Sequence, residues 1–327
     1  MKRSRFLLAL GLLACGCVGD GIGTAAASKA PSLAIAPANM GAVAAMGTTL
    51  VSMNLPFHSG GEAPPSLPGG TPANLTGLSL ALFTRLLGDG HPGPGLPARF
   101  SRHCANGGTL RFDTRRRQAD HRPLQAGERL VVRLDGCDEF GTAMDGTVTY
   151  RLERYRGDLN DTGRARLRLD YHGLGFATLA GRTRVDGRAR AYIDTAASTT
   201  RVDFRAERLD YRVERRDSVG RLKISRQRLR FTIDHEASTV TTLANDAHFR
   251  FPALAGRLSV STPRALIASA DGAIRAGTVA LRGARSTLYL SYPEPSVIRL
   301  DLDCGNNGTI DASHSASPTE LEARPWQ

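Results

Sequence analysis

The stretch Arg164-Ala-Arg-Leu-Arg-Leu-Asp-Tyr171 alternates strictly between charged and apolar residues. A period of two places one set of side chains on the buried face of a β-strand and the other set in solvent. Similar alternation recurs between residues 184 and 213. No proline occurs between Pro123 and Pro252, so no missing N–H group interrupts a strand in this region. The sequence therefore predicts a mostly all-β protein.

A weak internal repeat of 20 residues runs through the same region and is marked by Arg168, Arg188, Arg208 and Arg228. Twenty residues suit two strands of seven or eight residues and two turns, so every second strand should be alike. The apolar parity changes between Ala206 and Leu209 and again between Ile224 and Leu229, and each change indicates a turn or a bulge. We expect a single antiparallel β-meander domain over residues 101–312.

The N-terminus has the pattern of an export signal. Three basic residues precede the apolar run 6–14. This run is too short for a bilayer, which requires about 20 residues, but it has the length of a signal-peptide core. The predicted signal peptide is residues 1–14.

The apolar run ends in Leu12-Leu-Ala-Cys15, which resembles the lipobox of bacterial lipoproteins. The resemblance implies that Cys15 is acylated, with Cys17 as the alternative site, and that the peptide before it is removed. Gly16 follows in place of an aspartate that would resemble an inner-membrane retention signal. The expected location is the outer membrane, lipid-anchored and facing the periplasm. An ordinary secreted protein cleaved nearby is the competing interpretation.

The region between the anchor and the β domain is rich in Ala, Gly, Ser and Pro, so residues 15–70 are predicted to be a flexible spacer. A leucine stripe with helical spacing then predicts one N-terminal amphipathic helix over 71–87, with Thr71 as its N-cap, and a linker follows up to residue 100. Only Arg85 could anchor this helix to a membrane surface, so we expect it to pack on the β domain. Residues 313–327 are predicted to be a disordered tail.

If Cys15 is lipidated, four cysteines remain, and they allow three full pairings. Cys104 and Cys137 flank one apparent hairpin, so a disulfide between them is expected in an oxidising compartment. Cys304 is then either unpaired or joined to Cys17. No cysteine or histidine has the spacing of a metal site.

Three blocks of sequence carry a family resemblance. They are Cys104-Ala-Asn-Gly-Gly-Thr109, residues 127–149 with Gly127-Glu-Arg-Leu-Val-Val-Arg-Leu-Asp-Gly-Cys137-Asp138, and residues 256–303, which begin with Gly-Arg-Leu-Ser-Val-Ser-Thr-Pro. On these blocks the chain resembles a family of uncharacterised proteobacterial β-rich lipoproteins. The resemblance implies an anchored β domain and supplies no catalytic residue.

In that family the last strand often runs into a loop that resembles a calcium site. The matching residues here are Asp303, Asn307 and Asp311, but Gly305 offers no side chain and Asn307 is neutral, while calcium prefers several carboxylates. We favour a structural turn over a metal site. No cofactor is expected.

The motifs of common enzymes are absent: there is no Gly-x-Ser-x-Gly, no His-Glu-x-x-His and no phosphate-binding glycine loop, and the eight histidines are scattered. A non-enzymatic protein is therefore expected, and a hydrolase site assembled from distant strands is the alternative.

The arginine-rich strands are the one feature that indicates a candidate binding surface. The chain carries a formal net charge of +12, so a partner of this surface would be anionic. The preferred interpretation is a solvated face with cross-strand Arg–Asp pairs. The alternative is a cationic stripe of Arg168, Arg188, Arg208 and Arg228 that binds lipopolysaccharide, anionic lipid or an acidic polymer. Nucleic acid is not an expected partner, because the predicted compartment lacks it.

These observations predict a membrane-anchored envelope lipoprotein that acts as a structural or interaction module, for example with another envelope protein. The alternative is a carrier of lipid or lipoprotein, in which a curved sheet or half-barrel would hold the 71–87 helix in its concavity. A carrier requires an apolar cavity, whereas a module should have a filled core.

Overall fold

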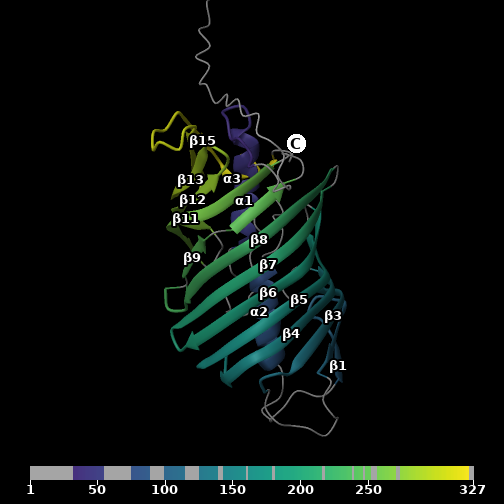
Figure 1. Cartoon of the computed structure of the whole chain (residues 1–327). Coiled ribbons are helices and arrows are strands. Elements are labelled where there is room, and N and C mark those ends of the chain that lie inside the picture. Colours follow the sequence, from purple (N-terminus) through teal and green to yellow (C-terminus); the bar gives the residue numbers. More distant parts are fainter. Residues whose placement is uncertain are drawn as a thin grey trace, which may run out of the picture.

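The computed structural model describes residues 32–54, 75–88, 99–114, 125–138, 143–159, 161–178, 181–215, 218–237, 239–245, 247–251, 256–269 and 273–323. These residues form one 15-stranded sheet and three short helices, and the sheet curves around two of the helices (Figure 1). The prediction of a mostly all-β antiparallel fold is confirmed.

The sheet is a meander in which each strand pairs antiparallel with its neighbours in sequence, except that β9 and β10 do not pair with each other. The strands are β1 (Arg99–His103), β2 (Thr109–Asp113), β3 (Arg129–Asp138), β4 (Ala143–Gly157), β5 (Gly163–Thr178), β6 (Gly181–Ala196), β7 (Thr199–Arg215), β8 (Ser218–Asp234), β9 (Thr239–Asn245), β10 (Ala247–Phe251), β11 (Gly256–Ser269), β12 (Ile274–Arg282), β13 (Thr287–Glu294), β14 (Val297–Asp303) and β15 (Ala312–Ala316). Strands β9 and β10 follow one another between β8 and β11, and each pairs with both.

The central strands are twice as long as the predicted seven or eight residues, since β5 to β8 contain 16 or 17 residues each. The parity changes in β7 and β8 are irregularities inside continuous strands and not turns. Glu207 is left out of the pairing between β6 and β7, and Arg226 has a φ of 55°. A spacing of 20 residues therefore connects adjacent strands, and the expectation that every second strand is alike was wrong.

Helix α2 (Leu75–Gly88) packs on the concave side of the sheet, as predicted for the leucine stripe. Leu75, Leu78 and Leu82 are buried, and the ring of Phe83 lies 5.2 Å from that of Tyr150 between centroids. The Tyr150 hydroxyl also donates a 2.8 Å hydrogen bond to the Ser79 carbonyl. Residues 71–74, which include the predicted N-cap, lie outside the described residues.

Part of the predicted spacer is a core helix, α1 (Met40–Asn54), which corrects that interpretation for residues 40–54. Val43 and Ala44 are fully buried. A Cβ atom at Gly47 would lie 2.6 Å from Leu281 Cδ1, so the helix backbone comes close to β12. An uncharged helix that is apolar on all sides is suited to a buried position, yet its Ala and Gly content resembles that of a linker. Residues 15–31 and 55–70 lie outside the described residues.

The C-terminal segment is also ordered over much of the predicted tail. Strand β15 pairs with β14, and α3 (Pro318–Ala323) buries Leu321 and contacts α1. The helix begins with a capping box, because the Glu320 N–H donates to Ser317 Oγ at 3.1 Å and the Ser317 N–H donates to Glu320 Oε2 at 2.7 Å. The β domain therefore extends from residue 99 to residue 316.

A helix that crosses a bilayer needs about 20 predominantly apolar residues. Within the part of the chain that is described, no helix has both the length and the apolar character needed to cross a membrane.

Candidate functional site

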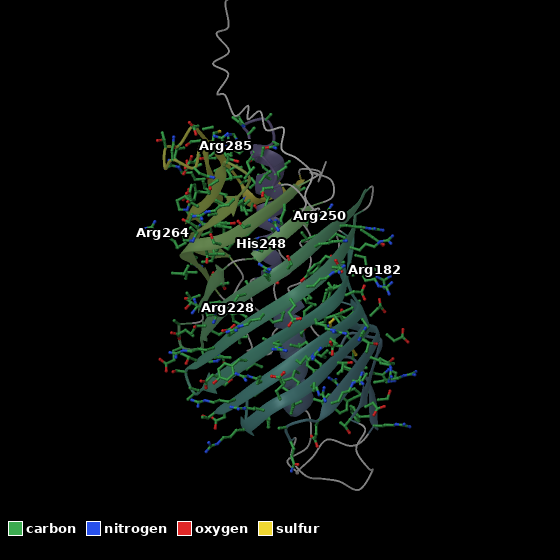
Figure 2. All side chains as sticks on the ribbon, in the orientation of Figure 1. Arg182, Arg228, His248, Arg250, Arg264 and Arg285 are labelled. Carbon is green, nitrogen blue, oxygen red and sulfur yellow. A yellow bond between two sulfur atoms is a disulfide. The ribbon has the colours of Figure 1, made fainter. Side chains whose placement is uncertain are left out.

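The four arginines singled out from the sequence lie on the outer, convex face of the sheet, where Figure 2 labels Arg228. Each of them forms an ion pair with an aspartate. The pairs are Arg168 Nε–Asp170 Oδ1 at 3.9 Å, Arg188 Nε–Asp170 Oδ1 at 3.2 Å, Arg208 Nη2–Asp210 Oδ2 at 2.9 Å and Arg228 Nη2–Asp203 Oδ2 at 2.7 Å. The four share one face as predicted, and the expected Arg–Asp pairing is present.

The four arginines do not form one row across the strands. Arg188 lies directly opposite Arg208, but Arg168 lies opposite Arg190 and Arg228 lies opposite Arg205. The reason is geometrical: on adjacent antiparallel strands, chain numbers run in opposite directions, so a constant spacing along the chain staggers the residues on the sheet. The four therefore share a face without forming a single stripe, and Arg168 and Arg228 belong to a different row from Arg188 and Arg208.

The pairing register places a different set of arginines in one continuous row. Six arginines face one another across the six consecutive strands β3 to β8: Arg129, Arg151, Arg168, Arg190, Arg205 and Arg228. All six are exposed or half-buried, while their sequence neighbours on the inner face are buried. With adjacent strands about 4.8 Å apart, the row is roughly 24 Å long. We call this set the arginine row.

The charge of the arginine row is only partly compensated. Like charges directly opposite one another destabilise a sheet, so the row requires compensation. Asp203 supplies some of it by accepting hydrogen bonds from Arg205 Nε at 3.1 Å and from Arg228 Nη2 at 2.7 Å. Although partial burial raises the pKa of Asp203, these two guanidinium groups hold it below its ordinary value. Among the described residues, no ion pair involves Arg129, Arg151 or Arg190.

An exposed aromatic side chain lies beside the arginine row. Tyr192 is two residues from Arg190 on β6 and is 38% exposed, although it is a large hydrophobic residue. Its hydroxyl donates to Asp194 Oδ2 at 3.4 Å. Across the neighbouring strands it lies opposite Arg166 and Asp203. The ring therefore offers an apolar contact surface within a field of guanidinium groups.

On the concave side, where it is described, buried side chains of the sheet and of helices α1 and α2 form one hydrophobic core. Four of the seven tyrosines are buried there, and burial raises the pKa of each hydroxyl. They are Tyr150, Tyr171, Tyr211 and Tyr292. These four hydroxyl groups are therefore shielded from solvent.

The loop proposed as a weak metal candidate is held together by its own backbone. The buried Asp303 carboxylate accepts N–H groups of Gly305 and Asn307 at 3.1 Å and of Gly308 at 2.8 Å. Asp311 Oδ2 accepts the Cys304 N–H at 2.6 Å, and Asn307 Oδ1 accepts the Thr309 N–H at 2.8 Å. This is the arrangement of a structural turn. Across the described ranges, no cluster of three or more His, Cys, Asp or Glu residues has the geometry of a metal site.

The predicted disulfide is present: Cys104, which follows β1, is joined to Cys137 in β3, with a Cα–Cα distance of 5.4 Å. Cys304 takes no part in a disulfide with a described residue. Cys15 and Cys17, the predicted lipidation site and its alternative, lie outside the described residues.

Comparisons with protein families, with curated proteins and with solved structures find no match to this chain. The functional interpretation therefore depends on its own residues and geometry.

Proposed function

We propose that the protein is a non-enzymatic interaction module of the bacterial cell envelope. In this proposal the chain is anchored in the outer membrane through lipid on Cys15 and faces the periplasm. The Leu12-Leu-Ala-Cys15 pattern supports the anchor. The Cys104–Cys137 disulfide supports an oxidising compartment, since such bonds persist mainly in exported proteins.

One observation carries the proposed role: the two faces of the sheet differ in character. The inner face is apolar and packs against the protein's own helices, as the contact between Phe83 and Tyr150 illustrates. The outer face of β3 to β8 presents the arginine row to solvent. A partner in solution meets the guanidinium groups first, and guanidinium groups bind carboxylates and phosphates well.

The carrier alternative has less support. A lipid held on the concave side would compete with α2, whose residues Leu75, Leu78 and Leu82 are already buried there. Binding would have to displace a helix whose packing stabilises the fold.

The test is site-specific photocrosslinking in cells that express the full-length protein. A crosslinker at Arg166, on the outer face of β5, should capture an envelope component. The matched control is Arg264 on β11, an exposed arginine away from the arginine row (Figure 2). Equal capture at both positions, or none at either, would contradict a role for the outer face. Stoichiometric lipid in the purified protein, lost on substitution of inner-face residues, would favour the carrier.

A further inference from the structure

We propose that the arginine row is a binding site for a linear acidic polysaccharide whose carboxylates pair with successive guanidinium groups. This inference deepens the proposed function and rests on it for the compartment in which such polymers are met.

The arginine row is long and narrow. The row is a single file of cations, and its members are separated by one strand spacing of about 4.8 Å. A linear polymer with anionic groups along its length can contact such a row along its whole extent. Arginine side chains are long enough to adjust to the polymer repeat, and each guanidinium can bind a carboxylate through two parallel hydrogen bonds.

Three positions of the arginine row are available for a ligand. Arg129, Arg151 and Arg190 form no ion pair with a described residue, so binding an external carboxylate breaks no existing pair. Arg205 and Arg228 both donate hydrogen bonds to Asp203, and this shared partner orients their guanidinium groups within the arginine row.

The width of the cationic region favours a polymer over a membrane as the ligand. Acidic residues lie on both sides of the row, with Asp170 opposite Arg188 on one side and Asp203 opposite Tyr192 on the other. A broad anionic surface such as a bilayer would place headgroups over these carboxylates as well. The sheet is also convex (Figure 1), so a flat membrane would touch only part of the row, whereas a flexible chain can follow the curve.

An exposed aromatic ring beside the row favours a polysaccharide over a polyphosphate as the ligand. Tyr192 exposes an aromatic ring next to Arg190 on the outer face of β6. A sugar ring has an apolar face of C–H groups that can pack on an aromatic ring, whereas a phosphate chain has no such face. An exposed tyrosine next to arginines therefore fits a charged sugar polymer.

The test measures binding of the full-length, detergent-solubilised protein to polygalacturonate, with neutral dextran, polyphosphate and lipopolysaccharide vesicles as the other probes. Wild-type protein should bind polygalacturonate, and affinity should fall at least tenfold between about 0.05 and 0.5 M salt, because exposed charges are screened. The double substitution Arg151→Gln/Arg190→Gln should weaken binding about tenfold or more, since it removes two charge-assisted contacts.

The matched control is Arg164→Gln/Arg212→Gln, which removes the same charge from the outer face. These two arginines are off the row and are already paired with Asp194 at 3.0 Å and Glu214 at 2.7 Å. Their loss should weaken binding less than about threefold, because little beyond long-range attraction is removed. Tyr192→Ala should weaken binding to polygalacturonate and leave any binding to polyphosphate unchanged.

Several results would overturn the inference. They are equal weakening in the row and control variants, no salt-sensitive binding by wild-type protein, or binding of lipopolysaccharide or polyphosphate with no binding of polygalacturonate. The last result would leave the proposed function standing with a different ligand. Absence of lipid on the protein would instead contradict the proposed anchor and leave the polymer measurement intact.

Discussion

Replacement of Phe83 by alanine should destabilise the protein strongly, because this side chain joins α2 to the sheet. Phe83 is fully buried, and its ring packs against Tyr150 at 5.2 Å. Truncation of a buried phenylalanine costs about 3–5 kcal/mol, and the better helix propensity of alanine returns roughly 0.5 kcal/mol. The net loss in the free energy of unfolding should be about 2.5–4.5 kcal/mol, which corresponds to a fall in Tm of roughly 10 °C for a domain of this size.

The assay is thermal and urea unfolding of the full-length protein, followed by circular dichroism. Phe100→Ala is the matched control, because Phe100 lies on the edge strand β1 and is 43% exposed. Its loss should change the free energy of unfolding by less than about 1 kcal/mol. If Phe83→Ala unfolded at the same temperature as Phe100→Ala, α2 would not be part of the core, and the filled concave side would be an incorrect interpretation.

Other predictions test the anchor, the disulfide and the titrating groups. Cys15→Ser should abolish palmitate incorporation, whereas Cys17→Ser should retain it; the reverse pattern would move the anchor to Cys17. Replacing Cys104 and Cys137 together by alanine should lower the free energy of unfolding by about 3–4 kcal/mol for a separation of 33 residues, and an unchanged urea midpoint would contradict this. The pKa of Asp203 is lower in the folded state than in the unfolded state, so the Asp203 carboxylate stabilises the fold above pH of about 4. This stabilisation is lost as the pH falls through the folded-state pKa. Asp203→Asn should therefore flatten the acid limb of a Tm–pH curve. Ultraviolet titration should show that the buried tyrosines stay protonated above their ordinary pKa of about 10 until the protein unfolds, so stability is lost at alkaline pH. The buried tyrosines are Tyr150, Tyr171, Tyr211 and Tyr292. Ionisation of all seven tyrosines of the chain before unfolding would refute the burial of these four.

Local patterns predicted the strands and one helix, because each is encoded in a short window. The alternation of residues 164–171 and the leucine stripe of α2 are of this kind. The C-terminal helix could have been found in the same way, since Ser317, Pro318 and Glu320 form a recognisable capping box. Helix α1 was missed because its uncharged, Ala-rich composition resembles a tether until a sheet is present to cover it.

The arginine row required information that a short window does not contain. Its members are brought together by pairing register, which depends on where each turn lies. The turn at Ala197 and Ser198 places Arg190 opposite Arg205, and this could have been worked out if the strands had been given their full length. The parity changes near Glu207 and Arg226 were compatible with a turn or a bulge, and turns there would have broken the row.

The contact between α1 and the last elements of the chain has a consequence for the order of folding. Each hairpin of the meander joins neighbouring segments, so strands can pair successively as the chain emerges into the compartment in which it folds. Helix α1 emerges first, yet it packs against β13 and α3, which emerge last. We therefore expect docking of α1 to be a late event, and until then its uncharged surface is a target for chaperones.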